Sequence, residues 1–122
     1  MSEKVTYQEE SQARRALVKW GKELYDQGLV KGSGGNLSIR LSDGTVLLTP
    51  TGFFLGHMTE ECISRCDMEG NLLGGNAPTK EVPLHLAVYR TRPNIRAVCH
   101  THSVYAVASA STMAPGTMMP LC

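Results

Sequence analysis

The sequence has no marked excess of charge, no long hydrophobic run and no paired-cysteine motif. Its 12 basic and 11 acidic residues leave a formal net charge of +1, which argues against a surface for nucleic acid or anionic membrane. No stretch approaches the roughly 18 consecutive apolar residues of a membrane-spanning helix, and no apolar signal core follows the initial methionine. We therefore expect a cytoplasmic protein whose partners are small molecules or proteins, with no nucleic acid and no membrane among them.

Motifs of several common enzyme classes are also missing. The chain contains no GxSxG elbow, no GxGxxG sequence and no Walker motif, which disfavours covalent hydrolase chemistry and nucleotide binding. The 4 cysteines follow no CxxC zinc spacing, and a cytoplasmic chain would normally keep them reduced. Buried thiols are the simplest interpretation of these cysteines.

The hydrophobic pattern predicts a mixture of helices and hairpin-linked strands in one domain. Apolar residues recur every three or four positions between Ala13 and Leu24, as in an amphipathic helix that ends near Gly28. Strands are predicted over 37–41 and 46–49 as a hairpin, near 71–73, and over 95–99, the last one buried. Further helices are predicted from Thr59 to about Cys66, from Thr79 to before Pro93, and after Ser103. This mixture indicates an α/β or α+β domain.

Two histidines end the last predicted strand. His100 and His102 are two positions apart, so their imidazoles would project from one face, about 6–7 Å apart at the backbone. Such a pair can converge on one metal ion, or it can consist of ordinary hydrogen-bonded histidines, and the spacing alone leaves both open. His57 and His85 have no partner at ligand spacing, and we interpret them as non-catalytic.

Other candidate residues have equally plain structural explanations. Glu81 could ligate a metal and act as a general acid or base, or it could favour the dipole of its helix. The glycine-rich segment 32–36 could turn backbone amides toward an anion, with Asn36 as a further donor, or it could be only a loop. The segment 49–52 is compatible with phosphate contact or with simple chain reversal.

Taken in order, four short motifs resemble those of the class II aldolase/adducin family. They are Gly34-Gly35-Asn36-Leu37-Ser38, Leu48-Thr49-Pro50-Thr51-Gly52, Pro78-Thr79-Lys80-Glu81 and His100-Thr101-His102-Ser103. The resemblance covers nearly the whole chain and implies an α/β fold, in which helices flank a central, mainly antiparallel sheet in three layers. It implies one domain over residues 1–122, corresponding to the N-terminal part of the family's domain.

The resemblance also implies a site. His100 and His102 match two of three zinc-binding histidines, and Glu81 matches the acid/base carboxylate that can also approach the metal. Zn²⁺ is the expected cofactor, with another divalent ion as the alternative. The positions that would hold the substrate phosphate are Gly35, Asn36, Thr51, Gly52 and Thr79. The family's third histidine lies further downstream than Cys122, so we expect a fragment that binds zinc weakly or not at all alone.

Lys80 suggests a branch within the family. Sugar-phosphate aldolases of the family typically carry a small hydroxyl residue there, whereas a lysine could pair with a substrate carboxylate or act on the neighbouring Glu81. The expected function is therefore that of a zinc-dependent carbon–carbon lyase for a small phosphorylated sugar or sugar acid, preferably a 3-oxo-tetronate 4-phosphate decarboxylase. The alternatives are a fuculose-phosphate-type aldolase or related epimerase, and an adducin-like interaction module without chemistry. The resemblance also implies a homotetramer.

Overall fold

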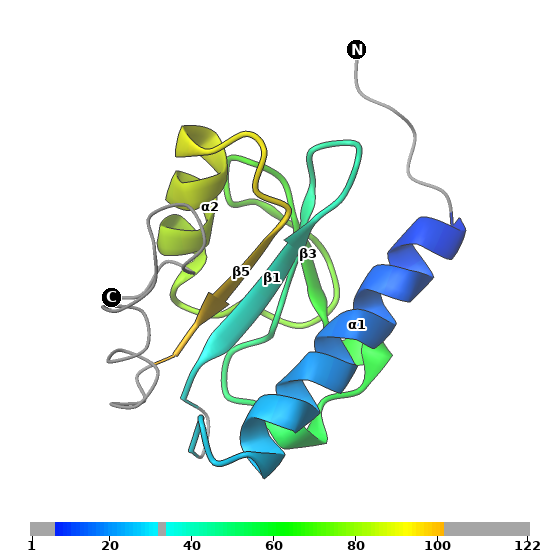
Figure 1. Ribbon diagram of the computed structural model, residues 1–122. Helices are drawn as coiled ribbons and strands as arrows, with labels where there is room; N and C mark the ends of the chain where they lie inside the picture. Colours follow the sequence, from blue (N-terminus) through cyan, green and yellow to red (C-terminus); the bar gives the residue numbers. More distant parts are fainter. Residues whose placement is uncertain (1–6, 32–33, 102–122) are drawn as a thin grey trace.

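The described part of the chain folds into three layers, with one α-helix on each side of a central sheet (Figure 1). The computed structural model describes residues 7–31 and 34–101. Helix α1 (Tyr7–Asp26) and helix α2 (Val82–Thr91) flank the sheet, and two short 3-10 helices, η1 (Leu55–His57) and η2 (Glu60–Cys62), lie between them in the chain. The strands are β1 (Asn36–Arg40), β2 (Val46–Leu48), β3 (Ser64–Cys66), β4 (Leu72–Gly74) and β5 (Ala97–His100). The predicted three-layer α/β fold is confirmed.

The five strands form one sheet in the order β4-β3-β2-β1-β5. Each neighbouring pair is antiparallel, as the family resemblance implied. Helix α2 connects β4 to β5 and brings the chain from one edge of the sheet to the other. Because β5 pairs with β1 in antiparallel register, the last residue of β5, His100, lies opposite the first residue of β1, Asn36.

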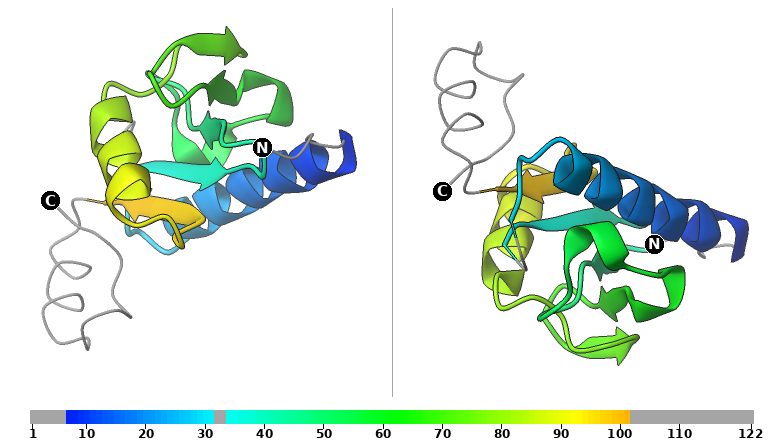
Figure 2. Two further views of the ribbon diagram at one scale, coloured as in Figure 1. Left: turned by 90° about the horizontal axis from the view of Figure 1, so that it is seen from above. Right: turned by 90° about the horizontal axis from the view of Figure 1, so that it is seen from below.

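Alternating side chains divide the interior into two cores, one on each face of the sheet. Leu47 packs toward α1, whereas its neighbours Val46 and Leu48 pack toward α2. The views along the sheet in Figure 2 show the two helices on its opposite sides. The core under α1 comprises Ala13, Leu17, Val30, Leu37, Leu41, Leu47, Leu55, Met58, Cys62 and Ile63. The core under α2 comprises Val46, Leu48, Cys66, Val82, Leu86, Tyr89 and Val98.

The helix predicted from Thr59 to about Cys66 is wrong. The chain forms only η2 (Glu60–Cys62) there and then enters β3. Arg14 of α1 donates hydrogen bonds to the carbonyl oxygens of Glu60 and Ile63. In a longer helix, backbone N–H groups of later residues would be the donors to these carbonyls. From Ile63 the backbone is extended and pairs with β2, so tertiary contacts override the local helix signal.

The other predicted elements are confirmed with shifted boundaries. The hairpin of β1 and β2, the short strand β4 and the first helix all lie where the pattern placed them. Strand β5 is also present, but it is an edge strand whose residues alternate in exposure rather than the predicted buried strand. Thr79 does not cap α2 directly: the cap residue is Glu81, whose backbone N–H donates to Oγ1 of Thr79 at 3.2 Å. The helix predicted after Ser103 lies outside the described residues. No helix in the described part of the chain is long and apolar enough to cross a membrane.

Candidate active site

The four sequence motifs meet at one end of the sheet. Asn36 of the first motif pairs with His100 of the last across β1 and β5. Thr49, in the second motif, is fixed to the first by two hydrogen bonds. Its backbone N–H donates to the carbonyl of Leu37 at 3.0 Å, and its Oγ1 accepts from the N–H of Leu37 at 3.2 Å.

The third motif is fixed beside the second. The backbone N–H of Thr79 donates to the carbonyl of Thr49 at 3.1 Å, and Thr51 donates to the carbonyl of Ala77 at 3.0 Å. Pro50 and Pro78 form an isolated bridge between these bonds. Glu81 follows as the N-terminal cap residue of α2, two positions after Thr79.

The predicted site residues differ strongly in exposure. Thr51, Gly52 and Lys80 are exposed, whereas Thr79 and Glu81 are partly buried. Only 6% of Asn36 and 1% of His100 are exposed. The predicted metal ligand His100 and its neighbour Asn36 therefore lie in the interior, whereas the predicted phosphate-binding loops lie nearer the surface. His102 lies outside the described residues.

Gly35 has a structural requirement in addition to its predicted phosphate contact. Its φ is +83°, and a Cβ there would lie 2.6 Å from Cγ1 of Val30 and 3.4 Å from the carbonyl oxygen of His100. Any other residue would combine backbone strain with a clash. The close approach of Gly35 to the end of β5 therefore explains the glycine without a ligand, and its contact with phosphate stays a prediction.

A buried polar network underlies the site. The side-chain oxygen of Asn36 contacts Nε2 of His85 and lies 3.3 Å from Nδ1 of His100. The hydroxyl oxygen of Ser38 lies 2.6 Å from Nδ1 of His85 and 2.6 Å from the hydroxyl of Tyr89. All five side chains are buried. The network thus joins β1, α2 and β5 under the end of the sheet.

The electrostatics of this network favour uncharged groups. Burial, together with the nearby His100, lowers the pKa of His85 to about 4, so this imidazole is neutral at pH 7. Burial raises the pKa of Tyr89 to about 12. Neither side chain therefore carries a charge near pH 7, and the network must be held by neutral hydrogen bonds.

The cysteines do not contribute a reactive thiolate to the site. Burial raises the pKa of Cys99 to about 11 and also raises that of Cys66, and both thiols are free of disulfides. Cys62 and Cys66 are buried, which confirms the prediction of buried thiols for these two, whereas Cys99 is only partly buried. Cys122 lies outside the described residues.

The contacts of His85 do not follow from its spacing to other histidines along the chain. Asn36 and Ser38 are separated from His85 by 49 and 47 positions. A usable signal was present: Asn36 and Ser38 are two apart on a strand, and His85 and Tyr89 are four apart on a helix. Both spacings place polar groups on a single face, and two such faces can pair in the interior. His57, by contrast, is exposed on η1.

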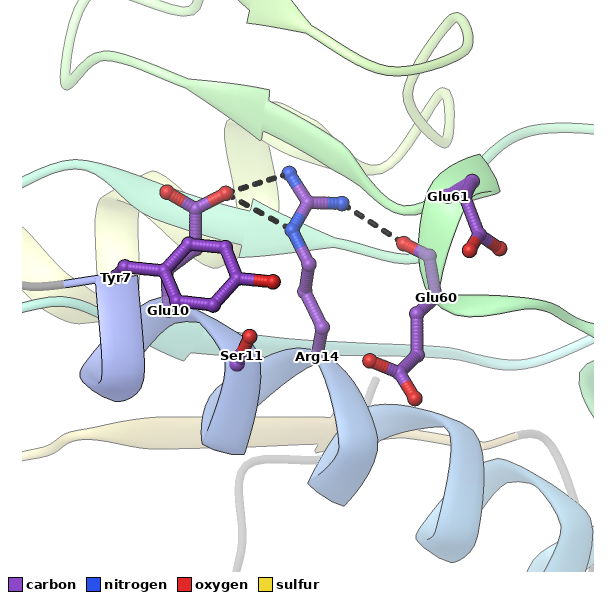
Figure 3. Close-up of a pocket in the computed structure, with 6 residues that line it drawn as sticks. All are labelled: Tyr7, Glu10, Ser11, Arg14, Glu60 and Glu61. Atoms are coloured by element: carbon purple, nitrogen blue, oxygen red, sulfur yellow. Dashed lines mark hydrogen bonds and ion pairs between the residues drawn. The ribbon is translucent and has the colours of Figure 1, made fainter.

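A separate hollow of about 380 Å³ lies near the start of α1, away from the four motifs (Figure 3). It is lined by Tyr7, Glu10, Ser11, Arg14, Glu60 and Glu61. Within it, Arg14 forms a 2.9 Å ion pair with Glu10 and a 2.8 Å hydrogen bond to the carbonyl of Glu60 (Figure 3). The guanidinium therefore holds α1 against η2 and is occupied by internal partners.

The described residues account for only part of a metal centre. Within 7–31 and 34–101, no three histidine, cysteine or acidic side chains come together in a way that could hold a metal ion. His100 nevertheless fits as one ligand, because metal-binding histidines usually direct their second ring nitrogen to an oxygen acceptor, and Nδ1 of His100 faces the amide oxygen of Asn36. The buried imidazole of His100 is thus compatible with a role as one metal ligand.

Comparison with known proteins agrees with this fold. Residues 15–121 match the family described as the class II aldolase and adducin N-terminal domain. The chain belongs to this class II aldolase and adducin family. The crystal structure of YgbL from Klebsiella pneumoniae superposes with a TM-score of 0.78 at 39% sequence identity, over 88% of this chain and 51% of YgbL.

Two curated relatives are named for different activities. The 3-oxo-tetronate 4-phosphate decarboxylase of Haemophilus influenzae is 47% identical over 95 residues, which are 78% of this chain and 45% of the relative. The L-fuculose phosphate aldolase of Methanococcus maripaludis is 47% identical over 93 residues, which are 75% of this chain and 50% of that relative. The chain therefore spans about half the length of the curated relatives it matches.

Proposed function

We propose that this chain contributes the described site to a zinc-dependent carbon–carbon lyase that acts on a small phosphorylated sugar acid, as a 3-oxo-tetronate 4-phosphate decarboxylase. The observation that carries the proposal is the pairing of His100 with Asn36 at the point where the Thr49 and Thr79 loops meet. This pairing brings a buried imidazole beside the two polar loops that we propose to bind the substrate. The decarboxylase relative supports the choice of reaction.

In this proposal His100 and His102 hold the metal, and Glu81 approaches it when no substrate is bound. When bound, Zn²⁺ or another divalent ion supplies Lewis acidity toward the substrate's oxygens. The loops around Gly35, Thr51 and Thr79 hold the substrate phosphate, and they thereby orient the reacting carbon atoms. Asn36 and Gly52 complete the proposed phosphate-binding set.

Glu81 is the proposed general acid of the reaction. When a β-keto acid loses carbon dioxide, the bond between the carboxylate carbon and the adjacent carbon breaks, and its electron pair stays with the adjacent carbon. That carbon must then receive a proton, and Glu81, at the start of α2, is the acid proposed to deliver it. The product would be a ketose phosphate one carbon shorter than the substrate.

An aldolase is the second candidate. A relative named L-fuculose phosphate aldolase matches at the same 47% identity, and aldol cleavage would use the same imidazoles and the same carboxylate. The exposed Lys80 favours the sugar acid, because an ammonium group can pair with a second anionic group of the substrate. An adducin-like module without chemistry has no use for this combination of residues. By resemblance we also propose a cytoplasmic homotetramer.

Metal content tests the proposal directly. We would measure zinc by mass spectrometry on the purified chain, on His100→Ala and on His57→Ala, with the intact mass read on each sample. Because the family's third histidine lies further downstream, each protein is first incubated with excess zinc. The expected result is clearly more bound zinc in the native protein and in His57→Ala, whose exposed ring lies on η1, than in His100→Ala. Equal metal content in all three proteins would overturn the proposed metal site.

A further inference from the structure

The buried network beneath His100 has a direction that follows from its donors and acceptors. An amide oxygen can only accept hydrogen bonds. Because the side-chain oxygen of Asn36 faces Nε2 of His85 and Nδ1 of His100, both of these ring nitrogens must carry hydrogens. One oxygen has two lone pairs, so Asn36 can accept from both imidazoles at once.

The direction extends to the other end of the network. His85 is fully buried, and its two described ring contacts are an amide and a hydroxyl, so a neutral ring is the favoured form. A neutral ring with hydrogen on Nε2 has its lone pair on Nδ1. The hydroxyl of Ser38, 2.6 Å from that nitrogen, must then donate to it, and Ser38 must accept from the hydroxyl of Tyr89.

We propose that His85 and Asn36, with Ser38 and Tyr89 behind them, are positioning residues that keep His100 in the tautomer with hydrogen on Nδ1. Nε2 of His100 then carries the lone pair with which an imidazole binds a metal ion. The tautomer of His100 itself does not depend on the proposed function, because it exists without metal or substrate. Only its use, metal binding through Nε2, rests on the proposed function. Asn36 is also one of the proposed phosphate-binding residues, whereas His85, Ser38 and Tyr89 need to touch neither the metal nor the substrate.

The arrangement has a clear physical use. In water the neutral imidazole favours hydrogen on Nε2, so an unsupported His100 would have to exchange tautomers before it could bind a metal through that nitrogen. The hydrogen bond on the other ring nitrogen decides which tautomer is present. Loss of such an outer partner typically weakens metal affinity about 10–100-fold, and we expect an effect of that size here.

Nuclear magnetic resonance can read the tautomer directly. We would record nitrogen–proton correlations of the histidine rings in the ¹⁵N-labelled, metal-free chain near pH 7.5, and assign them with single histidine variants. The proposal expects protonated Nδ1 and unprotonated Nε2 for His100, and protonated Nε2 for His85. Protonated Nε2 and unprotonated Nδ1 at His100 would overturn the proposal, and a measurement on the native protein is sufficient to show this. That pattern would arise if the side-chain nitrogen and oxygen of Asn36 exchanged places.

Three variants separate positioning from simple stability. His85→Leu removes the donor to Asn36, so we expect the His100 signals to shift toward the Nε2-protonated form and the zinc dissociation constant to rise about 10–100-fold. His85→Gln keeps an N–H group that can reach Asn36, and it should largely restore both readouts. Leu86→Ala removes a neighbouring buried side chain and should lower stability without changing the tautomer.

Titration with zinc in the absence of substrate, against a competing chelator, distinguishes this inference from the proposed function. If His100 has the expected tautomer but the native chain takes up no zinc, the positioning network stands and the proposed metal site fails. If zinc binds through His100 but His85→Leu changes neither tautomer nor affinity, the metal site stands and the positioning role of His85 is wrong.

Discussion

The hydroxyl oxygen of Ser38 lies 2.6 Å from Nδ1 of His85, although 47 positions separate the two residues in the chain. This contact joins the central strand β1 to helix α2 in the interior, directly below the end of the sheet where Asn36 meets His100. A residue pair that looks unrelated in the sequence thus supports the candidate site. The predictions below follow from this interior and from the contacts around it.

The pH dependence of stability should report the burial of His85. Its pKa is about 4 in the folded chain against 6.5 for an ordinary histidine, so the unfolded chain binds more protons between these values. The contribution of His85 to the free energy of unfolding, roughly 3 kcal/mol, should therefore be complete above about pH 6.5. It should be lost as the pH drops toward 4.

Urea unfolding of the metal-free chain between pH 7.5 and 4 measures this effect. His85→Gln provides the comparison, because it lacks the titrating ring and keeps every other group. Glu9, Asp43 and Asp67 also have lowered pKa values, but they titrate in both proteins and cancel in the difference. Parallel pH profiles for the two proteins would contradict the prediction.

Arg14 should stabilise the segment between η2 and β3. Its NH1 group donates to the carbonyls of Glu60 at 2.8 Å and Ile63 at 3.1 Å, and its side chain is 18% exposed. Arg14→Met should lower the free energy of unfolding by about 1–3 kcal/mol, because partly buried carbonyls lose their donor. Arg15→Met removes the same charge from the exposed neighbouring position and should change stability by less than about 0.5 kcal/mol. Equal losses in urea titrations would count against a specific role for Arg14.

Gly75 should tolerate no side chain. Its φ is +80°, and a Cβ there would lie 2.0 Å from the carbonyl oxygen of Ile63. Gly44 has a φ of +90° with nothing within 4 Å of its Cβ position, so Gly44→Ala isolates the backbone strain, about 1–2 kcal/mol. Gly75→Ala should cost clearly more in thermal or urea unfolding, since Ile63 must move. If the two variants lost similar amounts of stability, the backbone around Ile63 would have to move at no cost in free energy, and the prediction would be wrong.

Lys80 should affect the choice of substrate. If its ammonium group pairs with a carboxylate, Lys80→Ser should weaken binding of a four-carbon phosphorylated sugar acid about 3–10-fold and leave binding of the matching sugar-alcohol phosphate nearly unchanged. Calorimetry on the native chain and the variant, with both ligands, measures the two ratios. A variant that binds both ligands as the native chain does would remove the basis for preferring a decarboxylase over an aldolase.

The local sequence pattern was sufficient to predict most helices and strands, but it was misleading for the segment after Thr59. The first helix, the hairpin and β5 each follow from a clear hydrophobic period over consecutive residues, and the structure confirms them. The segment after Thr59 has acidic residues that favour a helix start, yet its carbonyls bind Arg14 and its backbone pairs with β2. Those partners come from distant parts of the chain, so no local window contains them.

The sequence by itself determined the order of the four motifs, the two-residue spacing of Asn36 and Ser38, and the four-residue spacing of His85 and Tyr89. Those spacings depend only on the period of a strand or a helix. Only the tertiary structure decided that the two faces meet and that Asn36 accepts from His85 beside His100. The reason is that the antiparallel return of β5 and the packing of α2 bring together residues up to 64 positions apart, and such contacts arise from the burial of whole elements.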